Sequence, residues 1–163
     1  HLFRGKDDDA VAIVHASELR ELSELTWGEL RHQTASMIAR LRALGVERGD
    51  RVAAYMPNIP EAIASFLATA SIGAVWSSCS PDFGPRSVID RFAQIEPKVL
   101  LAVRTYRYNG REFDRSEALD EITAAMDART VILGEADWPA WLGEREGNVG
   151  ALLRPCPSDW LRV

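Results

Sequence analysis

Apolar strand-like segments alternate with amphipathic helical segments along residues 1–133, and this alternation most constrains the fold. The strand-like segments are connected by helices and short joints, and they lie at 51–56, 74–77, 99–103 and 130–133. Segment 99–103, Val-Leu-Leu-Ala-Val, is apolar at every position, as expected of a parallel strand that is buried on both faces. The pattern predicts an α/β fold in which helices flank a layered, mostly parallel sheet.

The most clearly delimited helix precedes the first of these strands. Thr26 and Glu29 form a capping-box pattern, in which each side chain can bond the backbone N–H of the other residue. Apolar residues follow at helical spacing as far as Leu44. Gly45 then stands where a left-handed residue commonly ends a helix. Ahead of this helix, residues 10–16 and 22–26 are expected to pair as two short strands.

The next helix is expected to begin near Pro60, with Asn58 as its N-cap. Its buried face is expected to carry the apolar residues Ile63, Phe66, Leu67 and Ala70. Further helices are predicted over 85–95 and 116–126, and a weaker helical segment over 137–145.

With 163 residues the chain has the length of one domain. The periodic pattern fades after Gly147, so residues 147–163 are predicted to be a weakly structured end. The sequence begins at His1 rather than at a methionine, and we expect it to be part of a longer protein. No stretch of about 18 apolar residues occurs, which argues against a membrane span.

Charge and cysteine content exclude several classes of partner. The net charge is −5 and the arginines are dispersed, which argues against a nucleic acid as a partner. The two cysteines, Cys79 and Cys156, are too few for a disulfide framework, and no Cys/His spacing typical of a zinc site occurs. We therefore expect reduced thiols, a cytoplasmic location and no metal site.

The apolar residues 73–76 are followed abruptly by Ser-Ser-Cys-Ser-Pro-Asp-Phe-Gly at 77–84. Ligands of α/β proteins bind beyond the carboxyl ends of the parallel strands. This end and the segment 104–111, which is expected to be a loop after strand 99–103, are therefore the candidate sites. No histidine lies beside Cys79 in the sequence, so this cysteine is interpreted as a small buried side chain rather than a nucleophile.

Several segments resemble the amino-terminal part of the adenylate-forming acyl-CoA synthetases. They are Leu-Thr-Trp-Gly-Glu-Leu at 25–30, Leu-Gly-Val at 44–46, Gly-Asp-Arg-Val at 49–52, Pro-Asn at 57–58 and Gly-Ala-Val at 73–75. The nine residues Trp-Ser-Ser-Cys-Ser-Pro-Asp-Phe-Gly at 76–84 are more specific. Together with 90–92 and 95–98 they resemble the acetoacetyl-CoA synthetases within this superfamily.

The resemblance implies a ligase that activates acetoacetate with ATP and Mg²⁺ and then transfers the acyl group from the adenylate to coenzyme A. Residues 1–163 would then be one incomplete subdomain of the large N-terminal domain. The family's phosphate loop, which ends in Pro-Lys, has no counterpart, and the only lysines are Lys6 and Lys98. We therefore expect this chain to hold no catalytic residue, to bind no cofactor alone and to be inactive alone.

Similarity to acetyl-CoA synthetases implies that four residues lie near coenzyme A. They are Ser80 and Asp82 in the first loop, and Tyr108 and Arg111 in the second. A guanidinium suits a phosphate bidentately, and a tyrosine ring can stack on adenine. The chain departs from the relatives at Pro81 and Asp82, where they carry glycines. The alternative is that Arg111 is a solvated arginine and Tyr108 a surface residue.

Two other interpretations remain open at this point. The chain could belong to another short-chain acyl-CoA synthetase, such as an acetyl-CoA synthetase, because the residues of the acyl pocket are not in the sequence. It could also be a standalone, non-catalytic domain that binds a nucleotide or a partner chain. An incomplete layered domain leaves sheet edges and helix faces uncovered, which predicts self-association of the isolated chain.

Overall fold

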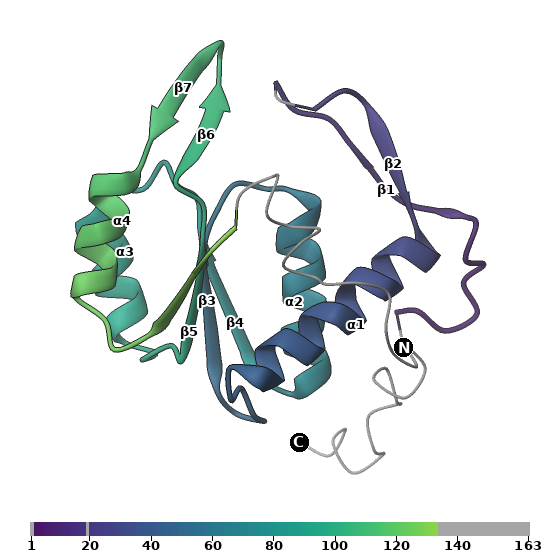
Figure 1. The fold of residues 1–163 in the computed structure, drawn as a ribbon, viewed down its shortest axis with the longest axis horizontal. Coiled ribbons are helices and arrows are strands. Elements are labelled where there is room, and N and C mark those ends of the chain that lie inside the picture. Colours follow the sequence, from purple (N-terminus) through teal and green to yellow (C-terminus); the bar gives the residue numbers. More distant parts are fainter. Residues whose placement is uncertain (1, 19, 134–163) are drawn as a thin grey trace.

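A four-stranded parallel sheet lies between two layers of helices in a computed structural model that describes residues 2–18 and 20–133 (Figure 1). The strand order is β4-β3-β5-β8, and every pairing in this sheet is parallel. The strands are β3 (Arg51–Tyr55), β4 (Val75–Cys79), β5 (Val99–Ala102) and β8 (Arg129–Ile132). The predicted α/β fold with a parallel sheet is confirmed.

Two helices cover each face of this sheet (Figure 1). One face is covered by α1 (Trp27–Ala43) and α2 (Pro60–Ile72), and the other by α3 (Pro85–Ala93) and α4 (Ser116–Ala124). Successive side chains of a strand point to opposite faces. Val52 and Ala54 accordingly join the core beneath α1 and α2, whereas Ala53 and Tyr55 join the core beneath α3 and α4.

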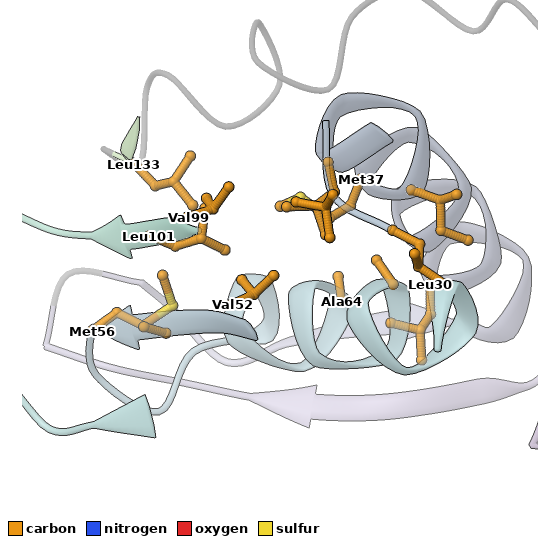
Figure 2. Packing of buried hydrophobic residues seen from close by; sticks show 14 of the residues in the cluster. Leu30, Met37, Val52, Met56, Ala64, Val99, Leu101 and Leu133 are labelled. Carbon is orange, nitrogen blue, oxygen red and sulfur yellow. The ribbon is translucent and has the colours of Figure 1, made fainter. Parts of the chain in front are cut away.

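The larger core lies between the sheet and the α1–α2 layer. Figure 2 shows Leu30 and Met37 of α1 gathered with Ala64 of α2 and with Val52 and Leu101 of the sheet. Each of these side chains is buried. The two helices of this layer pack directly on each other, so the core is shared between both helices and the sheet.

Both predicted ends of α1 are confirmed. The Glu29 backbone N–H donates to Thr26 Oγ1 at 3.2 Å, and the Thr26 N–H donates to Glu29 Oε2 at 2.8 Å. Beyond the helix, Gly45 adopts a φ of 83°, in the left-handed region that favours glycine. The chain then turns into β3.

The predicted buried face of α2 is largely wrong. Phe66 and Ala70 are exposed, and Ile63 and Leu67 are only half-buried. The face that is fully buried consists of small residues instead: Ala64, Ser65, Ala68 and Thr69. Small side chains bring the α2 backbone close to its neighbours, so the larger apolar residues lie at the margin of the contact.

The two hydroxyls buried on α2 are satisfied within the helix. Ser65 Oγ donates to the Glu61 carbonyl at 2.7 Å, and Thr69 Oγ1 donates to the Ser65 carbonyl at 2.8 Å. Such bonds to the carbonyl four residues earlier allow a polar residue to enter a helix–helix contact without an unpaired hydroxyl. The N-cap of α2 is Ile59 and not Asn58 as predicted, and no side chain caps this end.

Two antiparallel hairpins accompany the central sheet. The predicted pairing near the amino terminus is confirmed, between β1 (Val11–His15) and β2 (Ser23–Thr26). The second hairpin, β6 (Thr105–Tyr108) with β7 (Arg111–Asp114), occupies the segment that was predicted to be a loop. Its turn, Asn109-Gly110, has φ values of 53° and 70°. Positive φ at both turn residues is typical of the two-residue turns that close hairpins.

The strand predicted over 74–77 extends further than expected. Ser78 and Cys79, beyond the predicted end, pair in register with Ala54 and Tyr55 of β3, so they belong to β4 and not to the following loop. The helix predicted over 137–145 and the weak end over 147–163 lie outside the described residues. Within the described residues, none of the helices combines the length and apolarity of a membrane span.

The small-residue face of α2 can be tested by enlarging one of its members. Ala64→Leu should lower the free energy of unfolding by about 1–3 kcal/mol, because a larger side chain overpacks this core. Urea denaturation measures the change. Ala70→Leu is the matched control, since the same substitution on the exposed side of α2 should change stability by less than about 0.5 kcal/mol. Equal effects of the two substitutions would contradict this assignment of the buried face.

Candidate functional site

The loop 80–84 follows β4 at the carboxyl end of the sheet and is held there by Tyr55. Tyr55 is the last residue of β3, and its hydroxyl lies 2.9 Å from the Pro81 carbonyl and 3.1 Å from the Phe83 carbonyl. Burial raises the pKa of Tyr55, so the hydroxyl stays protonated and can donate to either carbonyl. Pro81 is buried, whereas Asp82 and Phe83 are exposed. The loop is therefore attached to the sheet by Tyr55, while Asp82 and Phe83 remain exposed to solvent.

Asp82 connects this loop to the β6–β7 hairpin. Ser80 Oγ donates to Asp82 Oδ2 at 2.8 Å, and the Tyr106 hydroxyl donates to Asp82 Oδ1. Arg115 donates to the Tyr106 oxygen at 3.0 Å. The hydrogen bond from Tyr106, followed by that from Ser80, holds the pKa of Asp82 below its usual range. We call Ser80, Asp82, Tyr106 and Arg115 the Asp82 network.

Aromatic stacking fixes the hairpin end of the Asp82 network. The Tyr106 and Phe113 rings stack with centroids 5.1 Å apart and planes at 13°. The Arg115 guanidinium lies 5.5 Å from each ring centroid, a cation–π arrangement. Tyr106 is only 8% exposed, and burial together with the bond to Asp82 raises its pKa. The base of the hairpin is thus attached to loop 80–84 by rigid groups.

The structure brings the four predicted site residues together in two pairs. Ser80 and Asp82 are hydrogen-bonded within the first loop. Tyr108 and Arg111 are cross-strand partners beside the turn of the hairpin. Tyr106 links the two pairs, because it contacts Asp82 and lies two residues before Tyr108, about 7 Å away along the strand.

One face of the hairpin carries both its anchored base and its open tip. Tyr106 pairs with Phe113 and Tyr108 pairs with Arg111, and strand alternation places all four on the same face. Tyr108 is 68% exposed. Arg111 is also exposed, and its guanidinium makes no ion pair within residues 2–18 and 20–133. The tip therefore presents an aromatic ring and a cation to solvent.

Sequence reasoning missed Tyr55, Tyr106 and Arg115 as residues of this site. One available signal was the Asn109-Gly110 pair, the strongest short-range signature of a hairpin. Reading 104–111 as a hairpin would have placed Tyr106 and Tyr108 on one face. The same interpretation would have placed Arg115, two residues after Phe113, on that face as well. The contacts of Tyr55 with Pro81 and Phe83, which are distant in the sequence, had no local signal.

Other candidate groups have structural roles. Cys79 is buried as predicted, with an Arg91 guanidinium nitrogen 3.5 Å from its sulfur. Lys98 Nζ lies 2.8 Å from Asp50 Oδ2 at the opposite, amino end of the strands, and this bond helps to hold the pKa of Asp50 below its usual range. No group of three or more His, Cys, Asp and Glu side chains suited to a metal ion occurs in the part of the chain that the structure describes.

Comparisons with known proteins agree on one family. The sequence model of the family described as "AMP-binding enzyme" matches residues 4–160. The chain is 48% identical over 139 residues to the acetoacetyl-coenzyme A synthetase of Rhizobium meliloti (strain 1021), which covers 85% of this chain and 21% of that protein. It is 45% identical over 135 residues to the acetoacetyl-CoA synthetase of Rattus norvegicus, covering 82% of this chain and 20% of that protein.

A solved structure extends the similarity to three dimensions. The acetoacetyl-CoA synthetase from Streptomyces lividans superimposes with a TM-score of 0.72 at 50% sequence identity, over 76% of this chain and 19% of that one. The present chain spans about a fifth of the length of the curated relatives that it matches.

The low pKa of Asp82 predicts a pH-dependent contribution to stability. A carboxylate whose pKa is lower in the folded than in the unfolded protein, where it is about 3.9, stabilises the fold above that value. The contribution is lost as the pH falls through the folded-state pKa. Asp82→Asn removes it at every pH, so the variant should be less stable than the parent protein near neutral pH. The difference should shrink at about pH 3, as measured by urea denaturation at both pH values.

Tyr106→Phe should reproduce most of this pH-dependent loss, because it removes the largest cause of the low pKa while keeping the stacked ring. Tyr108→Phe is the matched control on the same strand and should leave the pH dependence unchanged. A stability difference between Asp82→Asn and the parent protein that is constant from neutral to acid pH would exclude the proposed stabilisation of the carboxylate.

Proposed function

Because the chain belongs to the family of AMP-binding enzymes, we propose that it forms the N-terminal part of an ATP-dependent acetoacetate–CoA ligase. The observation that carries the proposal is the 45–48% identity to two acetoacetyl-CoA synthetases over more than four fifths of the chain. In the proposed reaction, acetoacetate displaces pyrophosphate from ATP to form an acyl-adenylate. The thiol of coenzyme A then takes the acyl group and releases AMP.

This chain contributes the scaffold and one side of the coenzyme A entrance. The tip of the β6–β7 hairpin receives the nucleotide end of coenzyme A. Tyr108, being largely exposed, offers a ring on which adenine can stack, and the Arg111 guanidinium can bind a phosphate through two parallel N–H groups. Among the described residues, no atom lies within 4 Å of the position that a methyl group on Gly110 would take, so this side of the turn is open.

Ser80 and Asp82 position this entrance rather than bind the phosphate themselves. A carboxylate repels a phosphate, and the oxygens of Asp82 already accept bonds from Ser80 and Tyr106. Their proposed role is to hold loop 80–84 and the base of the hairpin in one arrangement. The binding groups at the tip then keep a defined position relative to the sheet.

ATP and Mg²⁺ serve the longer enzyme, and no residue of this chain is proposed to hold them. Neither lysine of the sequence is presented to a reacting phosphate. Lys98 is paired with Asp50, and Lys6 lies over the Trp27 ring at 5.1 Å from its centroid. The 163-residue chain is therefore proposed to be inactive alone. A cytoplasmic location fits its two cysteines, since disulfides are rare in that compartment.

The proposal is tested with the longest encoded protein that contains this sequence. That protein should release pyrophosphate and consume the thiol of coenzyme A when given ATP and acetoacetate, with acetate as the comparison acid. Clear preference for acetate would instead support another short-chain acyl-CoA synthetase. The 163-residue chain should release no pyrophosphate under the same conditions, and release by this chain would disprove its proposed inactivity.

Self-association of the isolated chain is proposed to occur through the open edge of β4. Among the described strands β4 pairs with β3 alone, and Val75 and Phe66 beside this edge are 51% and 45% exposed. Unpaired edges of this kind pair with other chains unless a charge interrupts them. Val75→Lys should therefore reduce the oligomer fraction in sedimentation velocity. Val14→Lys, at an exposed valine of β1, is the matched control, and an equal effect of both would argue against the β4 edge.

A further inference from the structure

The two hairpins of the molecule touch at their tips. Figure 1 shows them side by side, and the Gly110 backbone N–H in the β6–β7 turn donates to Glu18 Oε2 at 2.7 Å. Glu18 belongs to the loop between β1 and β2, so the bond joins residues 92 positions apart in the sequence. This carboxylate reaches the turn that separates Tyr108 from Arg111.

The geometry of the turn explains why it accepts an anion. In a two-residue hairpin turn the flanking residues, here Tyr108 and Arg111, form the last cross-strand pair. The N–H groups of the turn residues point away from that ladder and need another acceptor. Gly110 finds this acceptor in a carboxylate. A hydrogen bond from a backbone N–H to an ionised oxygen is the same kind of contact that a phosphate makes.

The loop that carries Glu18 is anchored rather than loosely placed. Arg20 binds Glu61 of α2 through two contacts, NH2 to Oε1 at 2.8 Å and NH1 to Oε2 at 3.1 Å, and the Glu61 side chain is 8% exposed. The Ser17 hydroxyl accepts a bond from the Arg20 N–H at 3.1 Å. Glu18 lies inside this short turn, so its carboxylate is held near the hairpin.

We propose that Glu18 competes internally for the phosphate position of the β6–β7 turn. Its carboxylate occupies the Gly110 N–H and places a negative charge one residue from Arg111. A nucleotide that bears a phosphomonoester must displace Glu18 to reach both groups. Binding of such a ligand and contact between the two hairpins are then mutually exclusive. The inference rests on the proposed function, because it takes the nucleotide phosphate of coenzyme A as the ligand.

The experiment measures binding of adenosine 3′,5′-bisphosphate by titration calorimetry, with the Gly110 amide signal followed by NMR. It uses the longest encoded protein that contains this sequence, because the 163-residue chain is expected to bind no cofactor alone. Glu18→Gln removes the charge but keeps an oxygen that can accept from Gly110. It should therefore preserve the fold and bind the bisphosphate about fivefold more tightly than the parent protein. Adenosine, which lacks the phosphates, should bind both proteins equally. Glu21→Gln removes one charge from the same loop and is the matched control, with no expected gain.

Two further variants make the outcome decisive. Glu18→Ala removes the contact altogether and should raise the affinity at least as much as Glu18→Gln. Adding Arg111→Ala to Glu18→Gln should cancel the gain. Bisphosphate affinity that is unchanged or lower in Glu18→Gln overturns the inference, as does absence of binding to both proteins. Failure of the proposed function would be seen separately, as absence of acetoacetate-dependent ligation by the longer protein.

Discussion

The burial of β3 on both faces is the constraint on which the remaining structure depends. Its side chains alternate between the two cores, so both helix layers pack against this single strand. Tyr55 ends that strand, and its side chain begins in the core beneath α3 and α4 and finishes at the carbonyls of loop 80–84. Tyr55 therefore connects the rigid core to the exposed end of the sheet, where its hydroxyl donates to a carbonyl of loop 80–84.

Asp82 then connects loop 80–84 to the second hairpin through its bond with Tyr106. A hairpin of two four-residue strands is marginal by itself. The Tyr106–Phe113 stack, the Arg115 guanidinium above it and the bond to Asp82 compensate for this at its base. With its base fixed in this way, the hairpin can leave the Tyr108 ring and the Arg111 guanidinium at its tip exposed. A binding surface supported by a strand register keeps its geometry better than a free loop of the same length.

Sequence patterns predicted several elements for which a local rule decides the outcome, although the Asn109-Gly110 hairpin signal was missed and the N-cap of α2 was misassigned. The capping box of α1 and the apolar run of β5 are local signals, and both were interpreted correctly. The buried face of α2 was not, because the close approach of its neighbours favours Ala64 and Ala68 over Phe66, and this approach is a tertiary property. The candidate site likewise combines features that a local signal predicts with features that only tertiary contacts decide. Its two segments, 80–84 and 104–111, follow from strand ends, although the second is part of a hairpin and not a loop. The bonds from Tyr55 to Pro81 and from Tyr106 to Asp82 depend on how distant segments meet.

Two carboxylates lie near a surface that is proposed to bind a phosphate, and their surroundings give them opposite roles in that binding. Asp82 accepts bonds from two hydroxyls and has the positive Arg115 close by, so its charge is largely compensated within the Asp82 network. Glu18 meets a neutral backbone N–H at the turn, so this contact does not compensate its charge. Asp82 can thus stay in place when an anion arrives at the tip, whereas Glu18 has to leave. One carboxylate therefore supports the hairpin at its base, and another covers its tip.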